Sequence, residues 1–107
     1  MGNSLQALES QYMLLTQNLS AVLAACKTQQ EKDAVMAQYV TARRNYWNAI
    51  HKTFHDDDPA VVSLVKQMGK EQKQIENAKN KLDDIAKVIG MITNAVAVGT
   101  ALAAAAG

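Results

Sequence analysis

The sequence predicts an all-α protein: a long antiparallel helical hairpin, coiled-coil-like, that completes a four-helix bundle by self-association. The 107-residue chain has a single proline and no glycine between Gly2 and Gly69, so it lacks the residues that interrupt helices. Apolar residues recur at a three-four alternation along most of the chain, which is the spacing of a coiled-coil seam. No stretch alternates apolar and polar residues as a half-buried strand would.

The first helical arm is expected over residues 4–54. A helix of about 50 residues would be roughly 75 Å long. An alternative ends this helix near Thr28, because Thr28 and Glu31 have the spacing of a capping box. The seam continues through that point without changing phase, which favours the unbroken helix. Its apolar positions are Leu5, Leu8, Tyr12, Leu15, Leu19, Val22, Cys26, Met36, Val40, Trp47, Ile50 and Phe54.

A turn is expected over residues 55–58, and a second arm over about 59–105. Asp58 is placed to cap this second helix, and Pro59 occupies its first turn, where a missing N–H costs nothing. The two arms have similar lengths and fold back on each other, so residues 1–107 are predicted to form one domain. The second seam comprises Val61, Leu64, Met68, Glu71, Ile75, Ala78, Leu82, Ile85, Ile89, Ile92, Val96, Gly99 and Ala103.

Charged residues are distributed unevenly along the chain. Residues 1–26 contain only Glu9 as a charged side chain, and residues 88–107 contain none. A two-helix hairpin would expose apolar side chains of this last segment, and soluble proteins seldom tolerate such a patch. We therefore expect a second copy to cover it, with small residues allowing close helix approach. The predicted interaction surface consists of Val88, Gly90, Met91, Ala97, Val98, Ala101 and Leu102.

Lipid is the alternative covering for this uncharged segment. Residues 88–107 are long enough to cross a bilayer, and Ala95, Gly99 and Ala103 have the spacing of small residues at membrane helix contacts. Asn94 and the many alanines weaken transfer into a bilayer, which favours burial against protein. The predicted partner is thus a second copy, with a dimer favoured, while a different protein or a membrane stays an alternative.

Two pairs of polar residues are candidate sites. His51 and His55 lie one helical turn apart, as in helix-borne metal pairs, but the facing segment offers no further ligand, so no metal is predicted. Arg43 and Glu71 both occupy seam positions and would face each other in the hairpin, where a polar pair fixes the register. Trp47 continues the seam and is predicted to lie in the core.

Composition argues against two function classes. A net charge of +1 disfavours nucleic acid as a partner, because phosphate binding depends on clustered basic residues. The sequence has no glycine-rich phosphate loop, zinc-ligand quartet, nucleophile elbow or triad spacing, so we expect neither an enzyme nor a cofactor. The N-terminal residues lack the pattern of a signal peptide, which predicts cytoplasmic synthesis, with specialised secretion or membrane association left open.

In size and predicted shape the chain resembles the Trp-x-Gly class of small secreted helical hairpins. The segment Trp47-Asn48-Ala49 is similar to their Trp-x-Gly turn, with alanine in place of glycine and a position before the bend. The resemblance implies export without a signal peptide. The sequence therefore predicts a non-catalytic interaction or structural protein that self-associates through its uncharged end. A membrane-associating or membrane-inserting hairpin, of the translocator or pore-former type, is the alternative.

Overall fold

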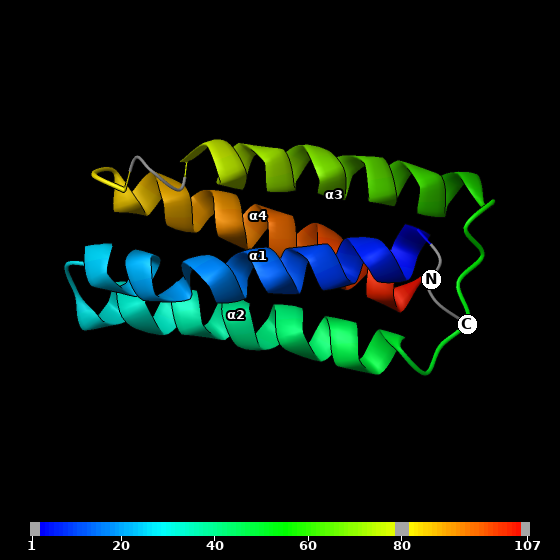
Figure 1. Ribbon diagram of the computed structural model, residues 1–107, viewed down its shortest axis with the longest axis horizontal. Helices are drawn as coiled ribbons and strands as arrows, with labels where there is room; N and C mark the ends of the chain where they lie inside the picture. Colours follow the sequence, from blue (N-terminus) through cyan, green and yellow to red (C-terminus); the bar gives the residue numbers. More distant parts are fainter. Residues whose placement is uncertain (1–2, 79–81, 106–107) are drawn as a thin grey trace.

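The computed structural model describes residues 3–78 and 82–105, which fold into a bundle of four helices (Figure 1). No strand occurs in these two described segments. The all-α class and the four-helix bundle are therefore confirmed, but all four helices come from one chain. The helices are α1 (Asn3–Ala25), α2 (Gln29–Ala49), α3 (Pro59–Ala78) and α4 (Ile85–Ala104).

The order of the helices around the bundle is α1, α2, α4 and α3. Neighbours in this ring pack side by side, and α1 also touches α4 across the middle, whereas α2 and α3 lie on the other diagonal and do not contact each other. The connection between α2 and α3 crosses one end of the bundle, drawn in green in Figure 1. At that end α1 and α3 begin and α2 and α4 finish, so each helix has one parallel and one antiparallel neighbour.

The unbroken first arm predicted over residues 4–54 is wrong, and the alternative break near Thr28 is confirmed. Thr28 has extended backbone angles, and its hydroxyl oxygen accepts the N–H of Glu31 at 3.1 Å. The Glu31 carboxylate accepts the N–H groups of Thr28 at 3.2 Å and Lys27 at 2.7 Å. This capping box gives partners to N–H groups at the start of α2, so the chain can reverse direction there at little cost.

The unbroken second arm predicted over residues 59–105 is also wrong. Helix α3 ends at Ala78, and α4 begins at Ile85 after Asp84, whose carboxylate accepts the N–H of Lys87 at 3.3 Å. Aspartate is a favoured residue directly before a helix, and the apolar spacing alone does not reveal this start. The bundle measures 42 Å along its longest axis, against the roughly 75 Å expected of unbroken arms.

The bend between the two halves of the chain is where the sequence places it, although it is longer than predicted. Helix α2 ends at Ala49, before the predicted end at residue 54, and α3 begins at Pro59. The Asp58 carboxylate accepts the N–H of Ala60 at 2.8 Å, as expected for a capping residue.

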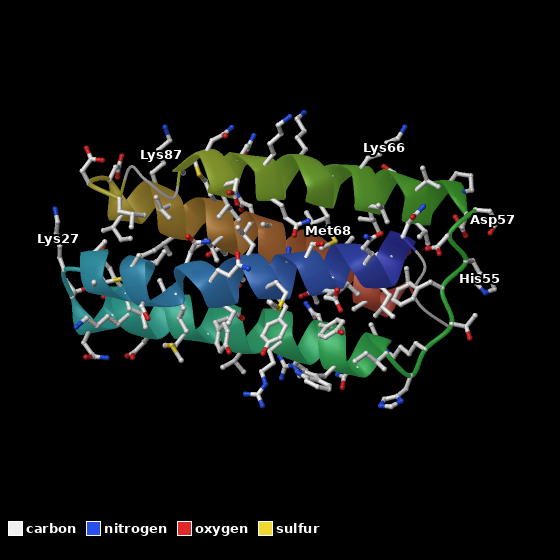
Figure 2. All side chains as sticks on the ribbon, viewed as in Figure 1. Lys27, His55, Asp57, Lys66, Met68 and Lys87 are labelled. Atoms are coloured by element: carbon white, nitrogen blue, oxygen red, sulfur yellow. The ribbon has the colours of Figure 1, made fainter. Side chains whose placement is uncertain are left out.

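The core consists of two clusters along the bundle. Met68 lies in the cluster near the crossing connection (Figure 2). Its buried members are Leu8, Ala49, Val61, Met68, Leu102 and Ala103. The cluster towards the other end is formed by Leu15, Val22, Val35, Ala42, Ile75, Ile85, Val88, Ile92, Ala95 and Val96.

The apolar side chains of the last segment are covered within the chain itself. Val88 is 3% exposed and Leu102 is 0% exposed, and Met91 and Val98 are half-buried against the two clusters. Of the predicted interaction surface, the exposed members are Gly90, Ala97 and Ala101. The prediction that Val88 and Leu102 lie on an intermolecular surface is wrong, because the reversal at Thr28 packs both α1 and α2 against α4.

The beginning of α1 is held by a residue from the crossing connection. The Asp56 carboxylate accepts hydrogen bonds from the backbone N–H and the hydroxyl of Ser4, which is fully buried. These hydrogen bonds lower the pKa of Asp56 below its ordinary value of 3.8, because they stabilise the ionised form. The contact joins two segments that are far apart in the sequence, so it fastens the connection to the bundle.

Replacing Asp56 by alanine is expected to lower the free energy of unfolding by about 0.5–2 kcal/mol at neutral pH, as for the loss of a helix cap. Because the folded pKa is lowered, this stabilisation is present above pH 3.8 and is lost as the pH falls through the folded value. Thermal melts of wild type and Asp56→Ala should therefore differ at pH 7 and converge at lower pH. Asp57→Ala, at an exposed neighbour, is the matched control, and an equal loss there would contradict the cap.

Candidate interaction surface on helix α2

The predicted seam residues of α2 point away from the core. Met36, Val40 and Trp47 are 38%, 49% and 53% exposed, and Ile50, directly after the helix, is exposed as well. Arg43 lies among them at the same three-four spacing and is exposed. We call these five residues the α2 stripe. The prediction that Trp47 lies in the core is therefore wrong.

Helix α2 instead buries the residues on its other side, Val35, Ala42, Asn45 and Ala49. Ala42 and Ala49 are enclosed in the core, and Asn45 donates a hydrogen bond to the Thr100 hydroxyl of α4 at 3.0 Å. Alanines let the axes of packed helices approach closely, which the bulky residues of the stripe would prevent. Helix α4 thus packs against the side of α2 that carries Ala42 and Ala49, and the α2 stripe is left outside.

Three tyrosines form a cluster of packed rings, the tyrosine cluster, beside the α2 stripe. The ring centroid of Tyr12 in α1 lies 5.9 Å from the ring centroids of both Tyr39 and Tyr46 in α2. The ring centroids of Tyr46 and Trp47 are 5.8 Å apart. The Tyr46 hydroxyl donates to a Glu9 carboxylate oxygen at 2.7 Å, and this bond raises the pKa of Tyr46 because it favours the protonated phenol. The half-buried rings pack between α1 and α2, and Tyr46 also packs against Trp47 of the stripe.

The residue types of this surface are those that protein interfaces favour. Aromatic residues, methionine and arginine are enriched in interfaces, and the stripe together with the tyrosine cluster contains all of them. No acidic side chain lies within the stripe, and Arg43 is its only charged member. The surface is therefore suited to an apolar partner that carries an acidic group.

The structure does not bring Arg43 and Glu71 together. Arg43 is exposed on α2 and Glu71 is half-buried on α3, two helices that do not contact each other. The predicted register pair is thus wrong, because it assumed that two unbroken arms face each other along their length.

The histidines are placed differently from the prediction as well. Helix α2 ends at Ala49, so His51 lies in a turn and His55 in the crossing connection, both exposed and not on one helix. Figure 2 shows His55 at the end of the bundle. Among the described residues, no group of three or more His, Cys, Asp or Glu side chains is suited to a metal ion.

Two hollows among the described residues differ in shape from a substrate site. An apolar void of about 20 Å³ lies in the core near Leu15, Val88 and Ile92, which is room for about one water molecule. A hollow of about 460 Å³ between α1 and α3 is open to solvent and lined by residues that include Gln72 and Lys73. Neither has the enclosed, largely apolar shape with a few converging polar groups that is typical of a substrate site.

Helix α4 is long and apolar enough to span a membrane, and 39% of its most apolar stretch of 18 residues is buried in the bundle. Core helices of soluble proteins have the same properties. Beyond Lys87 the exposed side of α4 carries no charge in the described residues. That side consists of Gly90, Thr93, Asn94, Ala97, Thr100, Ala101 and Ala104.

Fold and surface together define a single-chain, all-α four-helix bundle that exposes the α2 stripe. Comparison with protein-family models, with curated proteins and with solved structures gave no match. The segment Trp47-Asn48-Ala49 of the Trp-x-Gly resemblance forms the end of α2 and comes directly before the crossing connection. The function is therefore argued from the chemistry of the α2 stripe.

Proposed function

We propose that this chain is a non-catalytic interaction protein that binds an amphipathic helix along the α2 stripe. The exposure of Trp47 within an apolar row at coiled-coil spacing is the observation that supports this most. Tryptophan is the residue most enriched among side chains that dominate binding energy, and soluble proteins rarely leave such rows uncovered. The proposed surface is thus on α2, and not on the end of α4 that the sequence favoured.

Binding would follow the helix-in-groove mode, in which a partner helix lays its apolar face against a preformed surface. The stripe is carried by a helix whose opposite side is locked in the core, so little conformational entropy is lost on binding. Met36, Val40 and Trp47 would insert between apolar side chains of the partner. Arg43 would pair with an acidic residue and so select the alignment.

The lone tryptophan provides the test. A synthetic peptide of about 20 residues is long enough to be helical. With leucine at three-four spacing and glutamate and lysine elsewhere, it should shift the emission of Trp47 to shorter wavelength, because its binding removes the indole from water. Met36→Lys should abolish the shift by placing a charge in the stripe. Met13→Lys replaces an exposed methionine of α1 that does not belong to the stripe and is the matched control.

An unchanged emission spectrum of the wild type at about 1 mM peptide would overturn the proposal, since it would mean an affinity weaker than about −4 kcal/mol. Equal loss of the shift in Met36→Lys and Met13→Lys would also contradict it. Circular dichroism of both variants checks that the bundle stays folded, which is expected because both side chains are exposed.

A membrane-associating bundle is the second candidate, supported by the length and hydropathy of α4 and by its uncharged exposed side. It requires wild-type protein to float with phosphatidylcholine liposomes. Ala97→Lys should then abolish flotation, because a lysine at the centre of a membrane helix costs about 3 kcal/mol. Ala97 is exposed, so the soluble bundle should tolerate the change. Wild-type protein that does not float contradicts this candidate and leaves the interaction protein untouched.

A further inference from the structure

We infer that the helix received by the α2 stripe is α2 of a second copy of this chain, in antiparallel orientation. The inference rests on the proposed function and names its partner. It starts from Asp33, which is exposed and lies three residues before Met36, so it continues the three-four spacing of the stripe towards the start of the helix. Its carboxylate accepts a hydrogen bond from the Gln29 side chain at 2.9 Å.

The extended row therefore carries one acid and one base, separated by two apolar residues. Along the helix it runs Asp33, Met36, Val40, Arg43 and Trp47. A row of this kind is complementary to itself only when it is reversed. A parallel pair would set Asp33 against Asp33 and Arg43 against Arg43, which disfavours that orientation.

An antiparallel pair with Asp33 opposite the second copy's Arg43 gives both charges of the row a partner. In the same register Met36 lies opposite the second copy's Val40, so apolar residues meet between two ion pairs. The arrangement has two-fold symmetry, and each contact occurs twice, as in most protein dimers. Trp47 then covers the first turn of the second copy's α2, near Gln29.

Other antiparallel registers do not pair the charges. A slip of one heptad in one direction sets Arg43 against Val40 and Asp33 against Ile50. A slip in the other direction sets Asp33 against Met36 and moves Arg43 beyond the start of the opposite helix. A desolvated charge facing an apolar side chain is costly, so the row specifies one register. Charge complementarity along the extended row thus points to a second copy as the occupant of the stripe.

Charge reversal tests the inference in the intact protein. Sedimentation velocity and light scattering should show mass rising from 11.6 kDa towards twice that value between about 1 μM and about 1 mM protein. Arg43→Asp and Asp33→Arg should each raise the dimer dissociation constant at least about tenfold, by setting like charges opposite each other. The double variant Asp33→Arg/Arg43→Asp should restore dimerisation, because it re-forms both pairs with their signs exchanged.

Arg44→Asp is the matched control, since it makes the same charge change at an exposed residue beside the stripe and should leave the dimer nearly unchanged. Cross-linking tests the orientation. When Met36→Cys and Val40→Cys chains, each also carrying Cys26→Ser, are mixed, the disulfide between the two different chains should form in preference to either self-pair. A preference for the Val40→Cys self-pair would overturn the antiparallel register.

Wild-type protein that stays monomeric throughout this concentration range overturns the second copy as occupant. So does a double variant that dimerises no better than the single variants. If the emission of Trp47 still shifts with the unrelated helical peptide, the interaction function stands and its partner is a different helix. If neither occurs, both the function and the inference are wrong.

Discussion

Replacing Leu102 by lysine is expected to unfold the single chain. The Leu102 side chain is fully enclosed by residues of its own chain, among them Leu8 and Met68 from α1 and α3. An unpaired ammonium group there costs several kcal/mol, which is comparable with the whole stability of a small domain, about 5–15 kcal/mol. Circular dichroism should show loss of helix, or a melting temperature far below that of the wild type.

The neighbouring variant Ala101→Lys is the control, because Ala101 is exposed on the same helix. Its free energy of unfolding should stay within about 0.5 kcal/mol of the wild type, as for surface substitutions in general. A Leu102→Lys protein that stays fully folded and differs from the wild type only in its oligomeric state would contradict burial within one chain. It would favour instead the intermolecular surface that the charge distribution suggested.

Replacing Gly99 by alanine is expected to destabilise the bundle, although alanine is the better helix former. A Cβ atom at Gly99 would overlap the side-chain oxygen of Gln11 and lie 3.2 Å from its Cδ. Gln11 is 1% exposed, and its amide nitrogen donates to the Ala95 carbonyl oxygen at 2.7 Å. The side chain can retreat only by giving up this bond, so we expect a loss of about 1–3 kcal/mol.

The sign of this effect should reverse when Gln11 is first replaced by alanine. Without the clash, Gly99→Ala gains helix propensity and should stabilise the Gln11→Ala protein by about 0.5–1 kcal/mol. The four proteins of this double-mutant cycle, compared by urea unfolding, should be strongly non-additive. Equal effects of Gly99→Ala in both backgrounds would show that Gln11 does not constrain position 99.

Local signals in the sequence agree with two of the helix starts, whereas the long-range apolar pattern predicts helices that are too long. Asp58 with Pro59, and Thr28 with Glu31, begin helices as their spacing indicates. The three-four alternation continues across the breaks because it is equally compatible with two long helices and with four short ones. An alternation alone does not measure helix length, whereas a capping side chain fixes a terminus to within a residue or two.

The candidate surface could be found from the sequence only in part. The three-four spacing predicts that Met36, Val40 and Trp47 form a coiled-coil stripe, but the size of these residues predicts that the stripe lies in the core, because large apolar residues are usually buried. Which side of α2 enters the core depends on how residues such as Ala42 and Ala49 fit against α4. That fit is a tertiary property, so residue size alone favoured the wrong row.

The start of α1 and the end of α4 both lie at the crossing connection, so the bundle has two unlike poles. Helix α1 begins and α4 ends at one pole, while α2 and α4 begin at the other (Figure 1). An antiparallel pair of α2 helices would set two such bundles side by side and head to tail. Any cargo joined to the chain ends would then sit at opposite poles, separated by about the 42 Å length of a bundle, which makes the pair a spacer of fixed span.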